Sequence, residues 1–217
     1  MKTVTSSKEL DYRWAGITAI SGIVGTVAYI GTIAASHSTS PILAVPLLFA
    51  FAFGITVSSI GLYYILGGST GSRMALIAAV ANVIAAAQLL AMLMVQMSVY
   101  SMVQQPEAAL KAVWWGLDVA WDLYVGTGTI LFALCMFGRR GLGAWLGVPG
   151  LLIGSLLLIF NIATFPKPPD TAGLVDFGPL VGLWYLVVYV RLGVSSILLE
   201  RKQRRATAPA AGSTAPN

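Results

Sequence analysis

The sequence predicts an all-α membrane protein: a bundle of six transmembrane helices with both termini in the cytoplasm. Of the 217 residues, 57% are hydrophobic and only 10% are charged, whereas soluble domains usually carry about 25% charged residues. So few charges cannot cover the wet surface of a soluble enzyme, and they also exclude a disordered chain and a coiled coil. With one Cys (Cys135) and one His (His37), the chain lacks the side chains for an internal disulfide or a multi-histidine metal site. We therefore expect no cofactor and no bound metal.

Six apolar runs predict the six spans. Each is long enough to cross about 30 Å of hydrocarbon, which takes about 20 helical residues. None alternates polar and apolar residues as a barrel strand does. The expected spans are residues 14–35, 42–66, 74–103, 113–137, 142–165 and 179–199. Residues 1–205 then form a single domain, and residues 206–217, which are small, polar and Pro-containing, are expected to be a disordered cytoplasmic tail.

Turn-forming residues separate the runs in order. HSTSP at 37–41 carries a helix-starting Pro, and GGSTGS at 67–72 is a flexible turn. QQPEA at 104–108 ends the third run and starts the fourth, GRRG at 138–141 is a tight basic turn, and 166–176 is a Pro-rich link. The first run is longer than the 7–15 residue core typical of a signal peptide, so we expect it to remain as a span.

The Lys and Arg residues predict the orientation. Ten lie on the side of the termini, and two, Lys111 and Lys167, lie on the other. Because basic residues concentrate on the cytoplasmic side, both termini are expected there. The expected contact with anionic headgroups involves Arg201, Lys202, Arg204 and Arg205. This basic cluster is short, lacks interleaved aromatic residues and lies beside a membrane helix, so no nucleic-acid partner is expected.

Small residues recur at helical spacing on two of the spans. Such faces let helix backbones approach closely, since lipid provides no hydrophobic drive for helix association. They fit a homo-oligomer contact or a membrane-protein partner, or packing within one bundle, which is the commoner role. The two faces are Ala15, Ala19, Gly22 and Thr26, and Gly143, Gly147, Gly150 and Gly154.

Three ionisable residues fall inside the predicted spans, where charge is costly and functional roles are common. Asp118 and Asp122 are four residues apart and share one helix face. At 1.5 Å per residue, Asp122 lies about 14 Å and Arg191 about 18 Å below the outer membrane edge. We therefore predict an Asp122–Arg191 ion pair, structural or functional. In the alternative interpretation, Arg191 extends to the cytoplasmic surface instead.

Further polar residues are predicted near the outer side, where they would line one outward-facing pocket with Asp118. Oxygen ligands in such a pocket could bind a cation, or a carboxyl group there could carry protons. The chain has no G-x-S-x-G, H-E-x-x-H, P-loop or dinucleotide motif. The residues added to the candidate site are His37, Gln96, Asn161, Asp170 and Asp176.

The second half of the chain, about Trp114 to Leu192, shows an ordered pattern. An Asp-bearing helix is followed by a basic turn, a Gly-rich helix ending in Asn, a Pro-rich loop and a final helix that carries Arg. This pattern resembles uncharacterised six-span bacterial membrane proteins of a domain-of-unknown-function type. The resemblance implies a bacterial inner membrane and a compact domain, and it implies no activity.

Three classes of function remain open. The first is a non-enzymatic scaffold, sensor or accessory subunit, favoured because no catalytic set of residues is recognisable. The second is a small ion-coupled transporter that uses Asp118, Asp122 and Arg191. The third is a membrane-embedded enzyme that acts on a lipid or isoprenoid through Asp118 and Asp122. A cavity that reaches Asp122 would favour the second and third classes.

Overall fold

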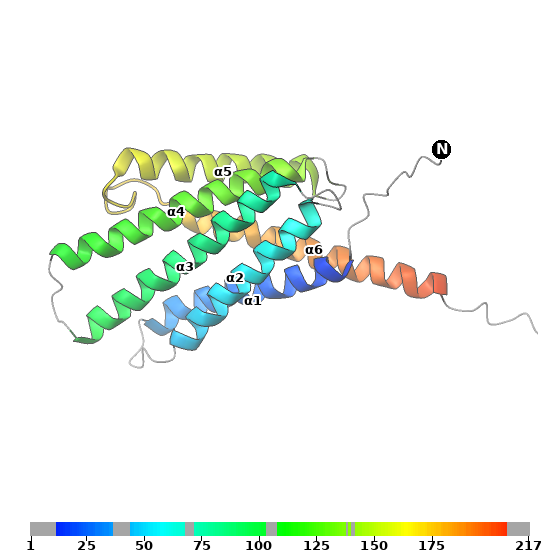
Figure 1. Cartoon of the computed structure of the whole chain (residues 1–217), viewed down its shortest axis with the longest axis horizontal. Helices are drawn as coiled ribbons and strands as arrows, with labels where there is room; N and C mark the ends of the chain where they lie inside the picture. The colour runs from blue at the N-terminus through cyan, green and yellow to red at the C-terminus, as the bar shows by residue number, and fades with distance from the viewer. Residues whose placement is uncertain are drawn as a thin grey trace, which may run out of the picture.

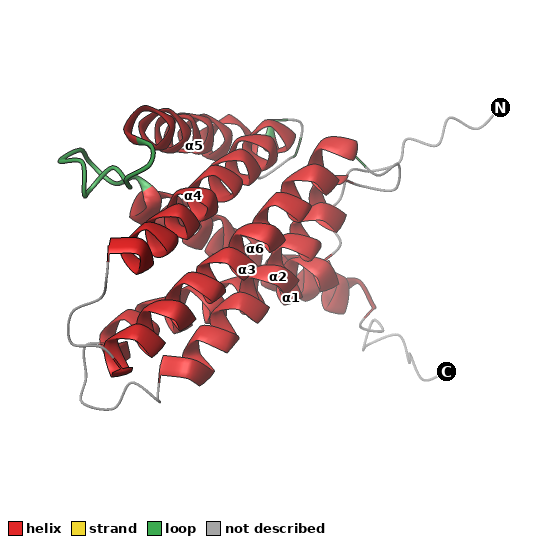
Figure 2. Cartoon of the chain, turned by 60° about the vertical axis from the view of Figure 1, so that its left-hand side comes forward, coloured by secondary structure: helices red, strands yellow, loops and turns green. Residues whose placement is uncertain are grey.

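The computed structural model describes residues 12–36, 44–67, 72–102, 108–137, 139 and 142–207. In this part of the chain the structure contains helices and no strand (Figure 2). All six helices are long and apolar enough to cross a membrane. The helices are α1 (Tyr12–Ser36), α2 (Ala44–Gly67), α3 (Arg73–Met102), α4 (Ala108–Met136), α5 (Gly143–Thr164) and α6 (Gly178–Thr207).

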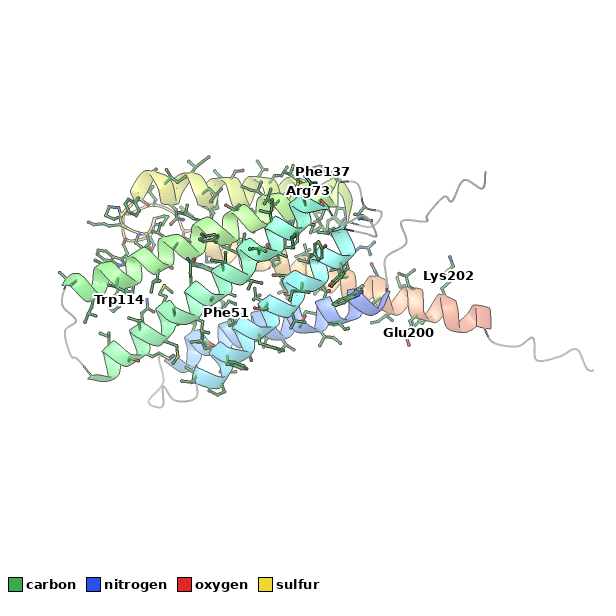
Figure 3. All side chains as sticks on the ribbon, viewed as in Figure 1. Phe51, Arg73, Trp114, Phe137, Glu200 and Lys202 are labelled. Atoms are coloured by element: carbon green, nitrogen blue, oxygen red, sulfur yellow. The ribbon has the colours of Figure 1, made fainter. Side chains whose placement is uncertain are left out.

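The predicted spans are confirmed, with two corrections. Helix α4 begins at Ala108, five residues before the predicted start, and α6 continues to Thr207, eight residues beyond the predicted end. The first two residues of the predicted disordered tail, Ala206 and Thr207, end helix α6, and residues 208–217 lie outside the described residues. The last part of α6, which carries Glu200 and Lys202, projects beyond the other helices (Figures 1 and 3). Its sequence ERKQRR continues the helix because Glu, Lys, Gln and Arg are good helix formers that need no apolar contact.

Neighbouring helices in the chain are neighbours in space. Helices α1 to α5 pack successively, and α6 packs against α1 and α5 (Figure 1). The start of α1 and the end of α6 therefore lie at one end of the bundle, called here the terminal end, together with the ends of α2 and α4 and the starts of α3 and α5. The opposite end, called the far end, holds the loop 165–177 and the start of α6 (Figure 2).

Glycine allows the closest helix contacts. A Cβ at Gly54 of α2 would lie 2.6 Å from the backbone oxygen of Ser21 and 2.8 Å from the Cα of Gly25, both on α1. A Cβ at Gly154 of α5 would lie 3.0 Å from the backbone oxygen of Gly126 on α4. These approaches leave no room for a side chain, as expected where small residues let helix backbones meet.

The two predicted small-residue faces serve packing within the bundle. On α1, Ala15 and Ala19 are buried, and Gly22 faces the ring of Tyr189 on α6. On α5, Gly147 and Gly150 face Ala133 of α4. Both faces are thus used inside one copy of the chain, as the commoner interpretation holds.

The outward surface of the bundle is apolar. Ile20, Phe49 and Ile162 are 65–67% exposed, and more than thirty large hydrophobic side chains of the described residues are at least 39% exposed. A soluble monomer rarely shows an apolar surface of this extent. Together with the six long apolar helices, it fits a multi-pass membrane protein.

Candidate functional site

Asp122 and Asn161 form a buried polar contact between α4 and α5. Asn161 Nδ2 donates to Asp122 Oδ2 at 2.9 Å and to the backbone oxygen of Leu157 at 3.0 Å. Asn161 is fully buried and Asp122 is 4% exposed, which makes Asp122 the one buried carboxyl group among the described residues. A buried carboxyl group without a hydrogen-bond donor is costly. The hydrogen bond from Asn161 therefore offsets part of the free-energy cost of burying Asp122.

The second oxygen of Asp122 faces the start of α6. A Cβ at Gly178, the first residue of α6, would lie 3.6 Å from Asp122 Oδ1 and 3.1 Å from Asp176 Oδ1. Asp176 also accepts a hydrogen bond from the Gly178 N–H at 2.8 Å. The N-terminus of a helix carries partial positive charge from its unpaired N–H groups, so it stabilises nearby carboxylates. Two acids therefore meet at one helix N-terminus.

Asp118 and Tyr29 complete what we call the far-end acid cluster: Tyr29, Asp118, Asp122, Asn161 and Asp176. Asp118 and Asp176 are near enough to Asp122 to interact with it electrostatically, and all three acids act on Tyr29 of α1. Asp118 is partly exposed and Asp176 is exposed. The structure therefore brings Asp122 together with Asn161 and Asp176, and the predicted outward-facing pocket lined by Asp118 stays a prediction.

The far-end acid cluster does not have the geometry of a metal centre. In the described part of the chain, no three His, Cys, Asp or Glu side chains are placed to hold one metal ion. The buried oxygen Oδ1 of Asn161 accepts no hydrogen bond from the described residues. The carboxyl groups are instead stabilised by an amide and by a helix N-terminus.

The predicted ion pair between Asp122 and Arg191 is wrong. Asp122 lies level with Gly178, and Arg191 follows thirteen residues later on the same helix. At 1.5 Å per residue this separates the two by about 20 Å along the axis of α6, farther than an Arg side chain extends. The sequence estimate failed because it measured depth on two helices as if both were perpendicular to the membrane and began at its edge.

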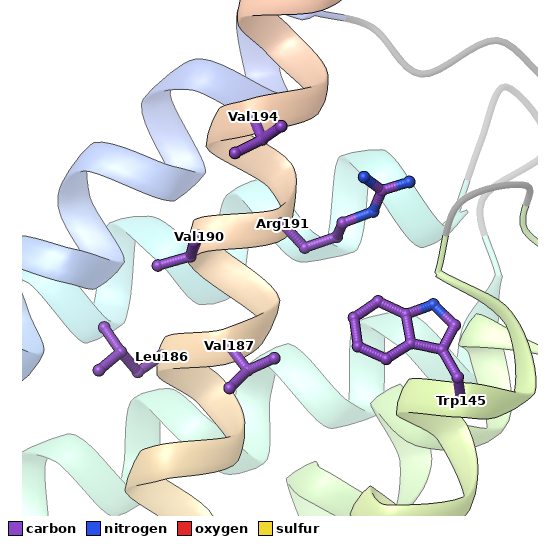
Figure 4. A pocket seen from close by; sticks show the side chains of 6 residues that line it. All are labelled: Trp145, Leu186, Val187, Val190, Arg191 and Val194. Carbon is purple, nitrogen blue, oxygen red and sulfur yellow. The ribbon is translucent and has the colours of Figure 1, made fainter.

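Arg191 instead lies on the surface of α6, toward the terminal end. Its side chain extends from α6 toward α5, and its guanidinium group lies nearer the terminal end than the ring of Trp145 (Figure 4). Arg191 is partly exposed. This placement agrees with the alternative interpretation, in which a long basic side chain extends from the membrane interior toward the interface.

Gln96, a further predicted site residue, does not join the far-end acid cluster. Gln96 is partly buried on α3, and none of the contacts that define the cluster involves it. His37 lies outside the described residues. Asp170 interacts electrostatically with Asp118 and Asp122, but it is exposed in the loop 165–177 and accepts a hydrogen bond from the N–H of Thr171 at 2.7 Å.

The structure reveals a second buried polar group that the sequence analysis missed. Tyr185 and Tyr189, one turn apart on α6, are both buried. Asn82 Nδ2 of α3 donates to the Tyr185 hydroxyl at 2.6 Å, and Thr129 of α4 donates to the same oxygen at 3.4 Å. The Tyr189 hydroxyl and Ser58 of α2 are 2.9 Å apart and share a hydrogen bond.

These five residues, which we call the tyrosine staple, join α6 to α2, α3 and α4 in the middle of the bundle. A signal for them was present in the sequence. Asn82 is an amide inside an Ala-rich span, and Tyr185 and Tyr189 share a helix face because they are four residues apart.

Two pockets of the described chain lie elsewhere. One, of about 360 Å³, lies between α5 and α6 and is lined by Trp145, Arg191 and aliphatic residues. The other, of about 390 Å³, lies between α3 and α4 and is lined by residues such as Ile77 and Tyr124. Both are open grooves on the outer surface, and neither is lined by Asp118 or Asp122.

Comparison with known proteins gives no match to a family model, to a curated protein or to a solved structure.

Proposed function

We propose that the protein is a non-enzymatic membrane protein of the bacterial inner membrane, a scaffold, sensor or accessory subunit with both termini in the cytoplasm. The observation that carries the proposal is how its buried polar groups are used. Asn161 binds Asp122, Tyr185 binds Asn82 and Thr129, and Tyr189 binds Ser58. Each contact joins different helices, so the side chains that a substrate would need serve to hold the bundle together.

A rigid bundle with an apolar exterior is suited to contacts within the membrane. Interhelical hydrogen bonds in lipid contribute about 0.6 kcal/mol each on average, and the glycine contacts add close packing. The wide apolar surface of the described helices is available to lipid or to a partner helix. In this proposal, any catalytic activity belongs to the partner proteins that the bundle binds.

Crosslinking in native membranes tests the proposal. A photoreactive residue at Phe49 on α2 and, in a separate variant, at Ile162 on α5 samples two exposed faces of the bundle. A scaffold or accessory subunit should give a discrete adduct from one face and only lipid adducts from the other. The matched variant is Asp122→Asn, which retains an acceptor for Asn161 and should give the same crosslinked adduct as the wild type.

The topology is tested separately by reporter fusions. A reporter that is active only outside the cytoplasm should be inactive after Leu66 and active after Pro169. Activity after Leu66 would contradict six spans with cytoplasmic termini.

A second candidate is an ion-coupled transporter that uses Asp118 and Asp122. It is favoured by the far-end acid cluster, in which three carboxyl groups interact and Asp118 is partly exposed. Arg191 has no part in this candidate, because it lies too far along α6. Flux measurements in reconstituted vesicles distinguish the two. A transporter should give a protein-dependent proton or sodium flux that Asp122→Asn abolishes and that Tyr124→Phe, at an exposed position of the same helix, leaves intact. This result would replace the scaffold proposal with the transporter.

A further inference from the structure

The groove between α5 and α6 combines an apolar wall with one charged group. Val187, Val190 and Val194 lie along α6 and are 39–48% exposed. Trp145, on the first turn of α5, is 55% exposed, and Leu186 completes the apolar lining. Among the described residues, Arg191 is the only charged one that lines this groove.

Arg191 lies at one edge of this groove. Its guanidinium group lies nearer the terminal end than the Trp145 ring, and the three valines extend along the α6 surface (Figure 4). Trp145 is two residues into α5, close in sequence to the basic turn in which Arg139 donates a hydrogen bond to the backbone oxygen of Leu66. The groove therefore runs along the lipid-facing surface and has its charge near the terminal end, where Trp side chains often mark the membrane interface.

We propose that this groove binds one anionic phospholipid from the leaflet at the terminal end. The phosphate group contacts Arg191, and an acyl chain extends from there away from the terminal end, along Val190 and Val187 and against Trp145. A guanidinium group binds phosphate oxygens with two parallel N–H···O bonds. Its charge is complementary to a headgroup of net negative charge, whereas the ammonium of a zwitterionic headgroup cancels that attraction.

The site matches a lipid better than a free anion. A free phosphate would gain nothing from three valines, and a hydrocarbon chain alone would gain nothing from the charge. About 360 Å³ of open groove gives one chain a continuous apolar contact. The proposal is independent of the proposed function, since a scaffold or a transporter could carry such a lipid.

Native mass spectrometry of the detergent-solubilised protein, titrated with phosphatidylglycerol and with phosphatidylcholine of the same chains, tests the site. The attraction of one basic residue to an anionic membrane surface corresponds to about a fivefold difference in binding affinity. We expect the first phosphatidylglycerol to bind about fivefold more tightly than phosphatidylcholine. Arg191→Leu should reduce this preference to about one, and Arg191→Lys, which keeps the charge but loses the two parallel N–H···O bonds, should retain only part of it.

Two further variants separate the groove from general surface charge. Arg73→Leu removes an exposed basic residue at the start of α3, also at the terminal end, and should leave the preference unchanged. Val190→Trp fills the groove and should weaken the first binding of both lipids alike, a result that does not depend on how Arg191→Leu folds. The proposal is overturned if Arg191→Leu keeps the wild-type preference, if Arg73→Leu lowers it equally, or if a second copy of the chain occupies the groove and excludes lipid.

Discussion

Asp122 and Arg191 are both ionisable residues within membrane-spanning helices, and the fold accommodates them in opposite ways. Asp122 is 4% exposed and is held by Asn161 of α5 and by the N-terminus of α6. Arg191 is partly exposed and extends along the surface of α6 to the start of α5. Neither compensates the other.

The difference follows from the length of the two side chains. An Asp carboxyl group is only one carbon away from the backbone, so its donors must be brought to it. Arg has a long aliphatic stem that contacts apolar surface while its charge reaches toward the interface. A short acid inside a membrane therefore indicates a built polar site, whereas a long base does not identify a partner inside the protein.

Among the variants that test this difference, Asn161→Leu should lower the free energy of unfolding the most. The substitution keeps a similar volume but leaves the buried carboxyl group of Asp122 without its amide donor. A buried acceptor left without its donor costs about 1–3 kcal/mol, and we expect the free energy of unfolding to fall by about that amount. Thermal melts in detergent measure it. Asp122→Asn keeps a hydrogen-bond acceptor and should cost clearly less, and equal losses would show that Asn161 acts through packing alone.

Replacing Tyr185 with Phe should have the next largest effect. The variant leaves the Asn82 amide without its acceptor in the middle of the bundle, where interhelical hydrogen bonds contribute about 0.6–1.7 kcal/mol, and it removes the longer contact with Thr129, which keeps its bond to the backbone oxygen of Val125. Tyr189→Phe removes a single bond, to Ser58, and should cost less. The same melts compare both with Tyr124→Phe, which is at an exposed position and should change nothing. If Tyr124→Phe lowered the stability as much as Tyr185→Phe, the hydrogen bonds of the tyrosine staple would not account for the effect.

The double variant Asp122→Asn with Arg191→Gln tests directly whether the two residues are independent. Sites that share no partner and lie more than about 10 Å apart add their effects to within about 0.5 kcal/mol. We expect the two changes in the free energy of unfolding to be additive within that range. A coupling of 1 kcal/mol or more in the double-mutant cycle would restore the ion pair.

Arg191→Leu should have the smallest effect on stability. A substitution on the lipid-facing surface usually changes the free energy of unfolding by less than about 0.5 kcal/mol. Its effect should instead appear in the preference for anionic lipid. A melting temperature that falls as far as in Asn161→Leu would show that Arg191 has a structural role inside the bundle.

Much of the candidate site could be predicted from the sequence because its members are rare in such a chain. Asp118, Asp122 and Asn161 are polar residues in apolar runs, and helical spacing places the two acids on one face. The tyrosine staple was harder to predict, because Tyr is common in membrane proteins and a hydroxyl group is compatible with both lipid and protein surroundings. Only the position of Asn82 opposite Tyr185 shows that this hydroxyl group has a partner.

The sequence by itself determined the six helices, their approximate ends and the polar residues among them, since length, hydropathy and turn residues act locally along the chain. The tertiary structure alone decided which polar groups meet. Helix rotation, tilt and the length of α6 set those contacts, and a shift of one helix by a few residues changes every pairing. The partner of Asp122 is therefore Asn161 with the N-terminus of α6, and Arg191 lies in a groove on the membrane-facing surface.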